Sequence, residues 1–140
     1  MNLIFTILSI AYIFCIFFWA DSPVVSDMAT CNPYSFLHIP LYGILTVFLT
    51  FAVIPCRLGR MDALLHSRGY AVLQLRMDAS SRLHFLIPGL IALGVAIADE
   101  FYQSFLPNRD ASPIDVFLDF IGITFALLLI FRLYKRQKNE

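Results

Sequence analysis

Four apolar stretches, each roughly long enough to cross a lipid bilayer, constrain the fold of this chain more than any other feature. A bilayer core about 30 Å thick needs roughly 20 apolar residues in a helix. The stretches cover approximately residues 3-20, 36-54, 83-105 and 113-133. Apolar residues make up 59% of the 140 residues and charged residues 14%, against about 45–50% and about 25% in soluble domains. The sequence therefore predicts an all-α integral membrane four-helix bundle and argues against a soluble enzyme, a disordered chain or a disulfide scaffold.

These stretches occupy most of the sequence, so residues 1-140 are predicted to form a single membrane domain. An inner loop, residues 56-82, and an inner tail, residues 134-140, complete it. We expect the first stretch to be retained as a span, because no Lys or Arg precedes Arg57. Its apolar run is also longer than the roughly 7–15 residues of a cleaved signal peptide.

The charges predict the orientation of the bundle. The net charge is zero, but the loop between spans two and three and the C-terminal segment hold nine of the 10 basic residues: Arg57, Arg60, Arg68, Arg76, Arg82, Arg132, Lys135, Arg136 and Lys138. By the positive-inside rule these segments are cytoplasmic, with both termini inside. This predicts a multi-pass integral membrane protein. Arg109 is the one basic residue expected outside, where most of the acidic residues also lie.

The inner loop is not simply polar. Leu64, Leu65, Tyr70, Leu73 and other apolar residues alternate irregularly with Arg and Asp in residues 56-82. An interfacial helix lying on anionic lipid is one interpretation. A solvated connector is the other, and both stay open.

Polar residues that could carry chemistry gather near the outer ends of three spans. Charged side chains in or near a span are costly and usually functional. Helical spacing puts Gln103 on the same side as both Asp99 and Glu100, and His38 on the same side as Tyr42. On the last span Asp115 and Asp119 share a face with the small residues Gly122 and Ala126, so this face is expected to point inward. The candidate cluster is therefore His38, Tyr42, Asp99, Glu100, Gln103, Arg109, Asp115 and Asp119.

Structural interpretations stand beside the functional one. Asp115 follows Ser112 and Pro113 as a helix-capping residue would, Asp99 and Glu100 could pair with Arg109, and His38 could hydrogen-bond a neighbouring helix. Asp119 lies too deep for capping, which favours a functional or inter-helix role. The sequence contains no compact His/Cys/carboxylate motif and no phosphate-binding loop, so neither a metal ion nor another cofactor is expected.

With these residues the chain resembles the VanZ-like family of small bacterial membrane proteins, named for a teicoplanin-resistance protein. The resemblance covers most of the chain. The matching residues are Asp21-Ser22-Pro23, His38-x-x-x-Tyr42, Asp99-Glu100-x-x-Gln103, Phe105, Pro107, Arg109, Ser112, Asp115 and Gly122. The departures are Asp21 for a Ser, Ser35 for a Lys, Asn108 for a Gly, Asp119 for an Asn and Ala126 for a Gly. Asp119 adds a negative charge to the family's pattern.

The resemblance implies a multi-pass protein of the bacterial cytoplasmic membrane with a cell-envelope role linked to reduced glycopeptide binding. It does not imply resistance itself for every member. Our first hypothesis is that the cluster binds or modifies an envelope lipid, a lipid-linked cell-wall precursor or an amphiphilic antibiotic at the outer face. Whether catalysis occurs stays open. The alternatives are an accessory or structural subunit docked to a membrane protein partner and, third, a transporter protomer. Membrane lipids are expected partners and nucleic acid is not.

Overall fold

Four helices form the protein in the computed structural model, which describes residues 2–20, 22, 36–53, 56–57, 74–75, 82–106 and 112–138. The helices are α1 (Leu3–Ala20), α3 (His38–Val53), α4 (Arg82–Gln103) and α5 (Pro113–Lys138). Two short strands, β1 (Cys56–Arg57) and β2 (Gln74–Leu75), pair antiparallel, with Cys56 opposite Leu75 and Arg57 opposite Gln74. Helix therefore dominates the described chain, as the composition predicts.

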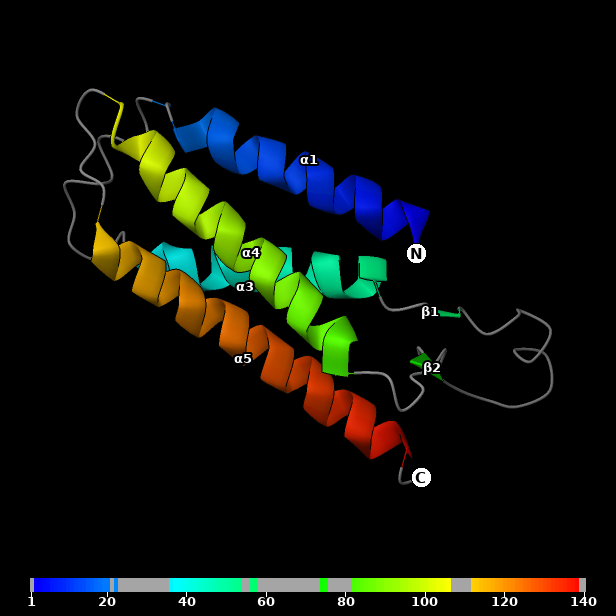
Figure 1. Ribbon diagram of the computed structural model, residues 1–140. Coiled ribbons are helices and arrows are strands. Elements are labelled where there is room, and N and C mark those ends of the chain that lie inside the picture. Colours follow the sequence, from blue (N-terminus) through cyan, green and yellow to red (C-terminus); the bar gives the residue numbers. More distant parts are fainter. Residues whose placement is uncertain are drawn as a thin grey trace.

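The helices run alternately up and down (Figure 1), so two ends of the bundle can be distinguished. The start of α1 lies beside the end of α3, where the Asn2 N–H donates to the Ala52 carbonyl at 3.0 Å. At the same end the Phe85 ring of α4 meets the Phe131 ring of α5 in an edge-to-face contact with centroids 5.7 Å apart. We call this end, which also carries β1, β2 and both termini, the basic end.

The surface of the bundle is more apolar than its interior. Large apolar side chains point outward, with 69% of Phe14, 65% of Phe101 and 66% of Phe125 exposed. The interior combines apolar side chains such as Leu45 with small and polar ones such as Ala92 and Thr46, each of which is fully buried. A surface of this kind is stable in lipid and not in water. The protein is therefore a helical membrane protein.

Three of the four helices, α1, α4 and α5, are long and apolar enough to cross a bilayer. The second predicted span is shorter than expected, because α3 has 16 residues and follows a 3-10 turn at Phe36 and Leu37. At about 1.5 Å per residue it is about 24 Å long. It packs against each of the other three helices, so protein, and not lipid, surrounds much of it.

The other predicted boundaries hold to within a few residues, with one exception. The last helix begins at Pro113, as the Ser-Pro pattern predicts, but continues to Lys138 instead of ending near residue 133. Most of the predicted tail is therefore helical, and its basic residues favour this because cations stabilise a helix C-terminus. In the inner loop, residues 56–57 and 74–75 are strand and Arg82 already belongs to α4. The rest of the loop, including most of the proposed interfacial segment, lies outside the described residues.

Helices α3 and α5 approach each other closely at Gly122. A Cβ atom on Gly122 would collide with the backbone carbonyl of Ile39 and lie 3.0 Å from the Ile39 Cα. On the facing helix, a Cβ on Gly43 would lie 3.5 Å from the Gly122 carbonyl oxygen. Small residues allow such backbone approach in membranes. The predicted inward face of the last span is confirmed, since Asp119, Gly122 and Ala126 are all buried.

Candidate functional site

The candidate residues meet at the end of the bundle opposite the basic end, which we call the cluster end. Helix α3 begins there, α4 ends there and α5 begins there (Figure 1). Of the eight candidates, the structure buries six: His38, Tyr42, Asp99, Glu100, Gln103 and Asp119. Asp115 is half-buried beside them, and Arg109 lies outside the described residues. The helical spacing thus identified side chains that the fold brings together.

Asp99 accepts hydrogen bonds from two helices. The Tyr42 hydroxyl donates to Asp99 Oδ2 at 3.1 Å, and the Gln103 amide donates to the same oxygen at 3.0 Å. Tyr42 is completely buried, so its hydroxyl needs a partner inside the protein. The contact links α3 to α4, and Gln103 bonds Asp99 across one helical turn as its spacing predicts.

His38 and Asp119 form an ion-pair contact between α3 and α5. His38 Nδ1 lies 3.0 Å from Asp119 Oδ1, and both side chains are almost wholly inaccessible. The ring of His38 also stacks on Tyr42, with centroids 6.3 Å apart. Asp119 therefore has the inter-helix role that its depth suggests, and His38 is oriented by a carboxylate on one side and an aromatic ring on the other.

Glu100 connects α4 to the start of α5. Its Oε2 accepts a hydrogen bond of 2.8 Å from the backbone N–H of Ser112, the residue just before the helix. In a capping box this donor would pair with a side chain three residues later, which here is Asp115. Glu100 occupies this donor, and the capping role of Asp115 in the first turn of α5 stays a prediction. The role of the Ser112 backbone was missed, and no side-chain pattern indicates it.

The cluster end carries more acid than base among the described residues. Each Lys and Arg that the structure describes lies toward the basic end, in β1, at the start of α4 or in the last turns of α5 (Figure 1). His38 is the only basic side chain that the described helices contribute to the cluster. The predicted pairing of the acids with Arg109 falls outside the described residues. Within the described residues, the charge of Glu100, Asp115 and Asp119 is therefore balanced by at most one histidine.

Three carboxylate oxygens of the cluster have no hydrogen-bond partner within the described part of the chain. They are Glu100 Oε1, Asp115 Oδ1 and Asp119 Oδ2, each inaccessible to water. An unsatisfied buried acceptor is costly and needs an explanation. His38, Glu100 and Asp115 each offer an atom within 4.8 Å of the others. These three residues could hold a metal ion.

Below the cluster, the buried polar side chains satisfy themselves within their own helices. The Thr46 hydroxyl donates to the Tyr42 carbonyl at 2.7 Å, and the Thr50 hydroxyl donates to the Thr46 carbonyl at 2.6 Å. Ser9 does the same with the Phe5 carbonyl at 2.8 Å. Such back-bonding occupies the hydroxyl hydrogens of these three residues within their own helices. The Tyr12 hydroxyl of α1 instead donates to the Leu41 carbonyl of α3 at 3.2 Å. Within the described helices, therefore, the polar groups of the cluster do not continue as a path through the bundle.

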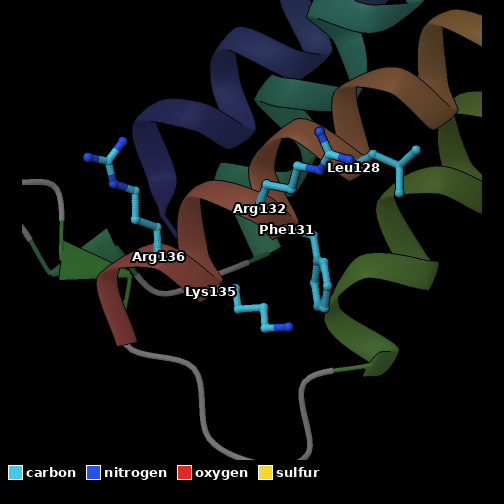
Figure 2. Close-up of a pocket in the computed structure, with 5 residues that line it drawn as sticks. All are labelled: Leu128, Phe131, Arg132, Lys135 and Arg136. Atoms are coloured by element: carbon cyan, nitrogen blue, oxygen red, sulfur yellow. The ribbon is translucent and has the colours of Figure 1, made fainter. Parts of the chain in front are cut away.

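A pocket lies at the basic end, far from the cluster. Figure 2 shows its lining residues along the last turns of α5: Leu128, Phe131, Arg132, Lys135 and Arg136. Basic side chains beside apolar ones at a helix end are typical of contact with anionic lipid head groups. The pocket contains none of the candidate residues and does not bear on the cluster's chemistry.

Comparison of the chain with family models, curated proteins and solved structures finds no match.

Tyr42→Phe is expected to lower the free energy of unfolding by about 0.5–1.5 kcal/mol, because it removes the buried hydrogen bond to Asp99 without removing the ring. Thermal unfolding in detergent, followed by circular dichroism, measures the change. Tyr102→Phe is the matched control: Tyr102 is exposed, and its edge-to-face contact with Phe17 survives the loss of the hydroxyl. Equal effects of the two variants would contradict a stabilising Tyr42–Asp99 bond.

Proposed function

We propose that this protein is a VanZ-like integral membrane protein of the bacterial cell envelope that binds the polar head of an envelope amphiphile at its cluster end. The observation that carries the proposal is the buried cluster contributed by α3, α4 and α5 in an otherwise apolar bundle. Ionisable groups in a membrane are costly and mark functional sites. If the protein also modifies the bound amphiphile, the groups that would act as general acid or base are His38, Asp99, Glu100 and Asp119.

The surroundings of the cluster support an amphiphilic ligand. Near the end of α4 and the start of α5, four side chains expose between 62% and 69% of their surface: Phe101, Phe105, Ile114 and Phe117. These side chains suit acyl chains, so an amphiphile could keep its tail in lipid while its head meets the polar groups. A lipid head group, a lipid-linked cell-wall precursor and an amphiphilic antibiotic all have this form.

We further propose that the cluster end faces outward and the basic end faces the cytoplasm. The described backbone keeps β1, β2, the start of α4 and the end of α5 at one end (Figure 1), and the sequence concentrates Lys and Arg in these segments. The positive-inside rule then makes that end cytoplasmic. The pocket lined by Arg132, Lys135 and Arg136 would meet anionic lipid there.

A structural or accessory subunit is the second candidate. Asp99, Glu100 and Asp119 each accept at least one hydrogen bond from another helix or from the loop before α5, so the cluster also ties the bundle together. Helix α1 adds a broad apolar surface, including Phe14, Phe18 and Trp19, each exposed by at least 65%. A membrane protein partner could pack against it.

Binding of labelled envelope amphiphiles to the purified protein tests the proposal. The probes are phosphatidylethanolamine, a polyprenyl-linked cell-wall precursor and a lipoglycopeptide, each presented to the protein in nanodiscs. At least one is expected to bind, and Asp119→Asn or Arg109→Gln is expected to weaken binding by roughly tenfold or more, the effect of losing one charged contact of about 1.5–3 kcal/mol. His84→Ala, at the other end of α4, is the control.

Two results would contradict ligand binding and favour the structural candidate. One is that no probe is chemically modified and that no probe binds in a way that depends on Asp119 or Arg109. The other is recovery of a stoichiometric membrane protein after mild-detergent extraction, together with full function of Asp119→Asn and His38→Ala in cells.

A further inference from the structure

We propose that His38, Glu100 and Asp115 form a binding site for a divalent transition-metal ion at the cluster end. The three residues come from three different helices, α3, α4 and α5, and one ligand atom from each lies within 4.8 Å of the other two. A point between the atoms is no farther than about 2.8 Å from each, so shifts of under about 1 Å would reach the roughly 2.0–2.2 Å of metal–nitrogen and metal–oxygen bonds.

Glu100 gives an independent indication that something occupies the space between these groups. Its side chain is 94% buried, being 6% exposed, and Oε2 is held by the Ser112 N–H at 2.8 Å. The other oxygen, Oε1, is inaccessible to water and has no hydrogen-bond partner among the described residues, and the same is true of Asp115 Oδ1. A bound cation would satisfy both oxygens and neutralise charge that would otherwise be very costly to bury.

Asp119 supplies the feature that most distinguishes a metal-binding histidine from a merely buried one. His38 Nδ1 lies 3.0 Å from Asp119 Oδ1. When Nδ1 carries the proton and donates it to this carboxylate, Nε2 keeps the lone pair that a metal needs. Metal-bound histidines usually donate their second nitrogen to a carboxylate or carbonyl, which fixes the tautomer and the ring orientation. Asp119 is therefore the positioning residue of the site.

The donor set favours a transition metal over Mg²⁺ or Ca²⁺. Magnesium and calcium prefer oxygen ligands alone, whereas one imidazole with carboxylates suits ions such as Zn²⁺ and Mn²⁺. Protonation of the acids is the competing way to remove their charge, but a neutral carboxyl adds an O–H donor that itself needs an acceptor. A metal ion satisfies the oxygens of Glu100 and Asp115 together.

Metal titration of the purified full chain tests the site without any amphiphile, so its outcome is independent of the proposed function. After treatment with a chelator, the protein in mild detergent is titrated with Mn²⁺ while the electron paramagnetic resonance signal of the free ion is recorded, and Zn²⁺ is then added as competitor. We expect one Mn²⁺ per chain, displaced by Zn²⁺. Pulsed measurements on the wild type should detect coupling of the bound Mn²⁺ to an imidazole nitrogen.

Variants assign the ligands. His38→Ala, Glu100→Gln and Asp115→Asn are expected to weaken binding by more than tenfold, and Asp119→Asn by about 10–100-fold, as for other residues that orient a metal ligand. His84→Ala should bind as the wild type does, because residue 84 lies about 24 Å along α4 from Glu100. Circular dichroism identifies any variant that has not folded, and the nitrogen coupling of the wild type tests His38 without a variant.

Three results would overturn the site. The first is a wild type that binds neither Mn²⁺ nor Zn²⁺. The second is a bound ion with no nitrogen coupling, or one whose affinity is the same in His38→Ala. The third is an ion that binds only after Arg109→Gln, which would identify Arg109, and not a metal, as the cation that neutralises the acids.

Discussion

Gly122→Ala is expected to destabilise the bundle by about 1–3 kcal/mol, the usual cost of forcing extra atoms into a packed interior. The new methyl group would collide with the Ile39 carbonyl, which is backbone and cannot rotate away as a side chain can. Helices α3 and α5 would have to separate at Gly122. Thermal unfolding in detergent, followed by circular dichroism, measures the loss.

The chain provides a graded set of controls for this variant. A Cβ on Gly94 of α4 would meet no atom within 4 Å, and one on Gly43 would make an ordinary contact of 3.5 Å with the Gly122 carbonyl oxygen. Gly94→Ala is therefore expected to be neutral or stabilising by up to about 1 kcal/mol through helix propensity, and Gly43→Ala to have a small effect. A Gly122→Ala protein as stable as Gly94→Ala would mean that α3 and α5 do not cross this closely.

The same crossing controls the geometry of the cluster. Ile39 follows His38 in α3, and Gly122 lies about one turn after Asp119 in α5, so separation of the helices would lengthen the 3.0 Å contact between His38 and Asp119. Gly122→Ala should therefore weaken metal binding as well as stability. A change in both measurements would show that one helix contact positions the site.

His38→Ala is expected to cost about 3–5 kcal/mol in the metal-free protein, because removing one partner of a buried ion pair leaves the other charge unpaired. Asp119 is completely buried, so water cannot replace the imidazole. Asp119→Asn should cost much less, since the amide oxygen of Asn can still accept a hydrogen bond from Nδ1. Reversible unfolding of the chelator-treated protein gives each value.

The double variant His38→Ala/Asp119→Leu isolates the interaction. It removes the charge that His38→Ala leaves behind, and an apolar replacement of a buried pair is often nearly neutral. We expect it to be more stable than His38→Ala alone, with a coupling of about 0.5–3 kcal/mol in the cycle. His84→Ala is the matched histidine control. If His38→Ala cost no more than this control, the His38–Asp119 contact would contribute nothing to folding.

Much of the fold could be predicted because each helix is a local property of the chain. The apolar stretch at residues 3-20 became α1 with the predicted bounds, and the Ser-Pro pattern located the start of α5. The end of α5 was predicted too early because hydropathy falls at Arg132, while the helical backbone continues to Lys138. The start of the second span was predicted two residues too early, because apolar composition does not distinguish the 3-10 turn at Phe36 and Leu37 from the α-helix that begins at His38.

The cluster was predicted for the same local reason, and its chemistry was not. Spacing of three and four residues identifies which side chains share a helix face, so His38 with Tyr42 and Asp99 with Gln103 could be paired from the sequence. The metal-ion hypothesis was set aside because no compact ligand motif occurs. In the structure His38, Glu100 and Asp115 approach from three helices, and no spacing rule within one helix can indicate such a set.

The sequence by itself determined that the protein lies in lipid, where the helices are and which of their faces point inward. Bilayer thickness and the helical repeat act on every segment independently, so these features can be inferred one segment at a time. Only the tertiary structure decided which carboxylate meets which donor. Glu100 and not Asp115 receives the Ser112 N–H, and Asp119 reaches His38 across the crossing at Gly122. These pairings depend on the distances between helices. Side-chain volume at the crossing sets those distances, whereas the order of residues along one helix does not.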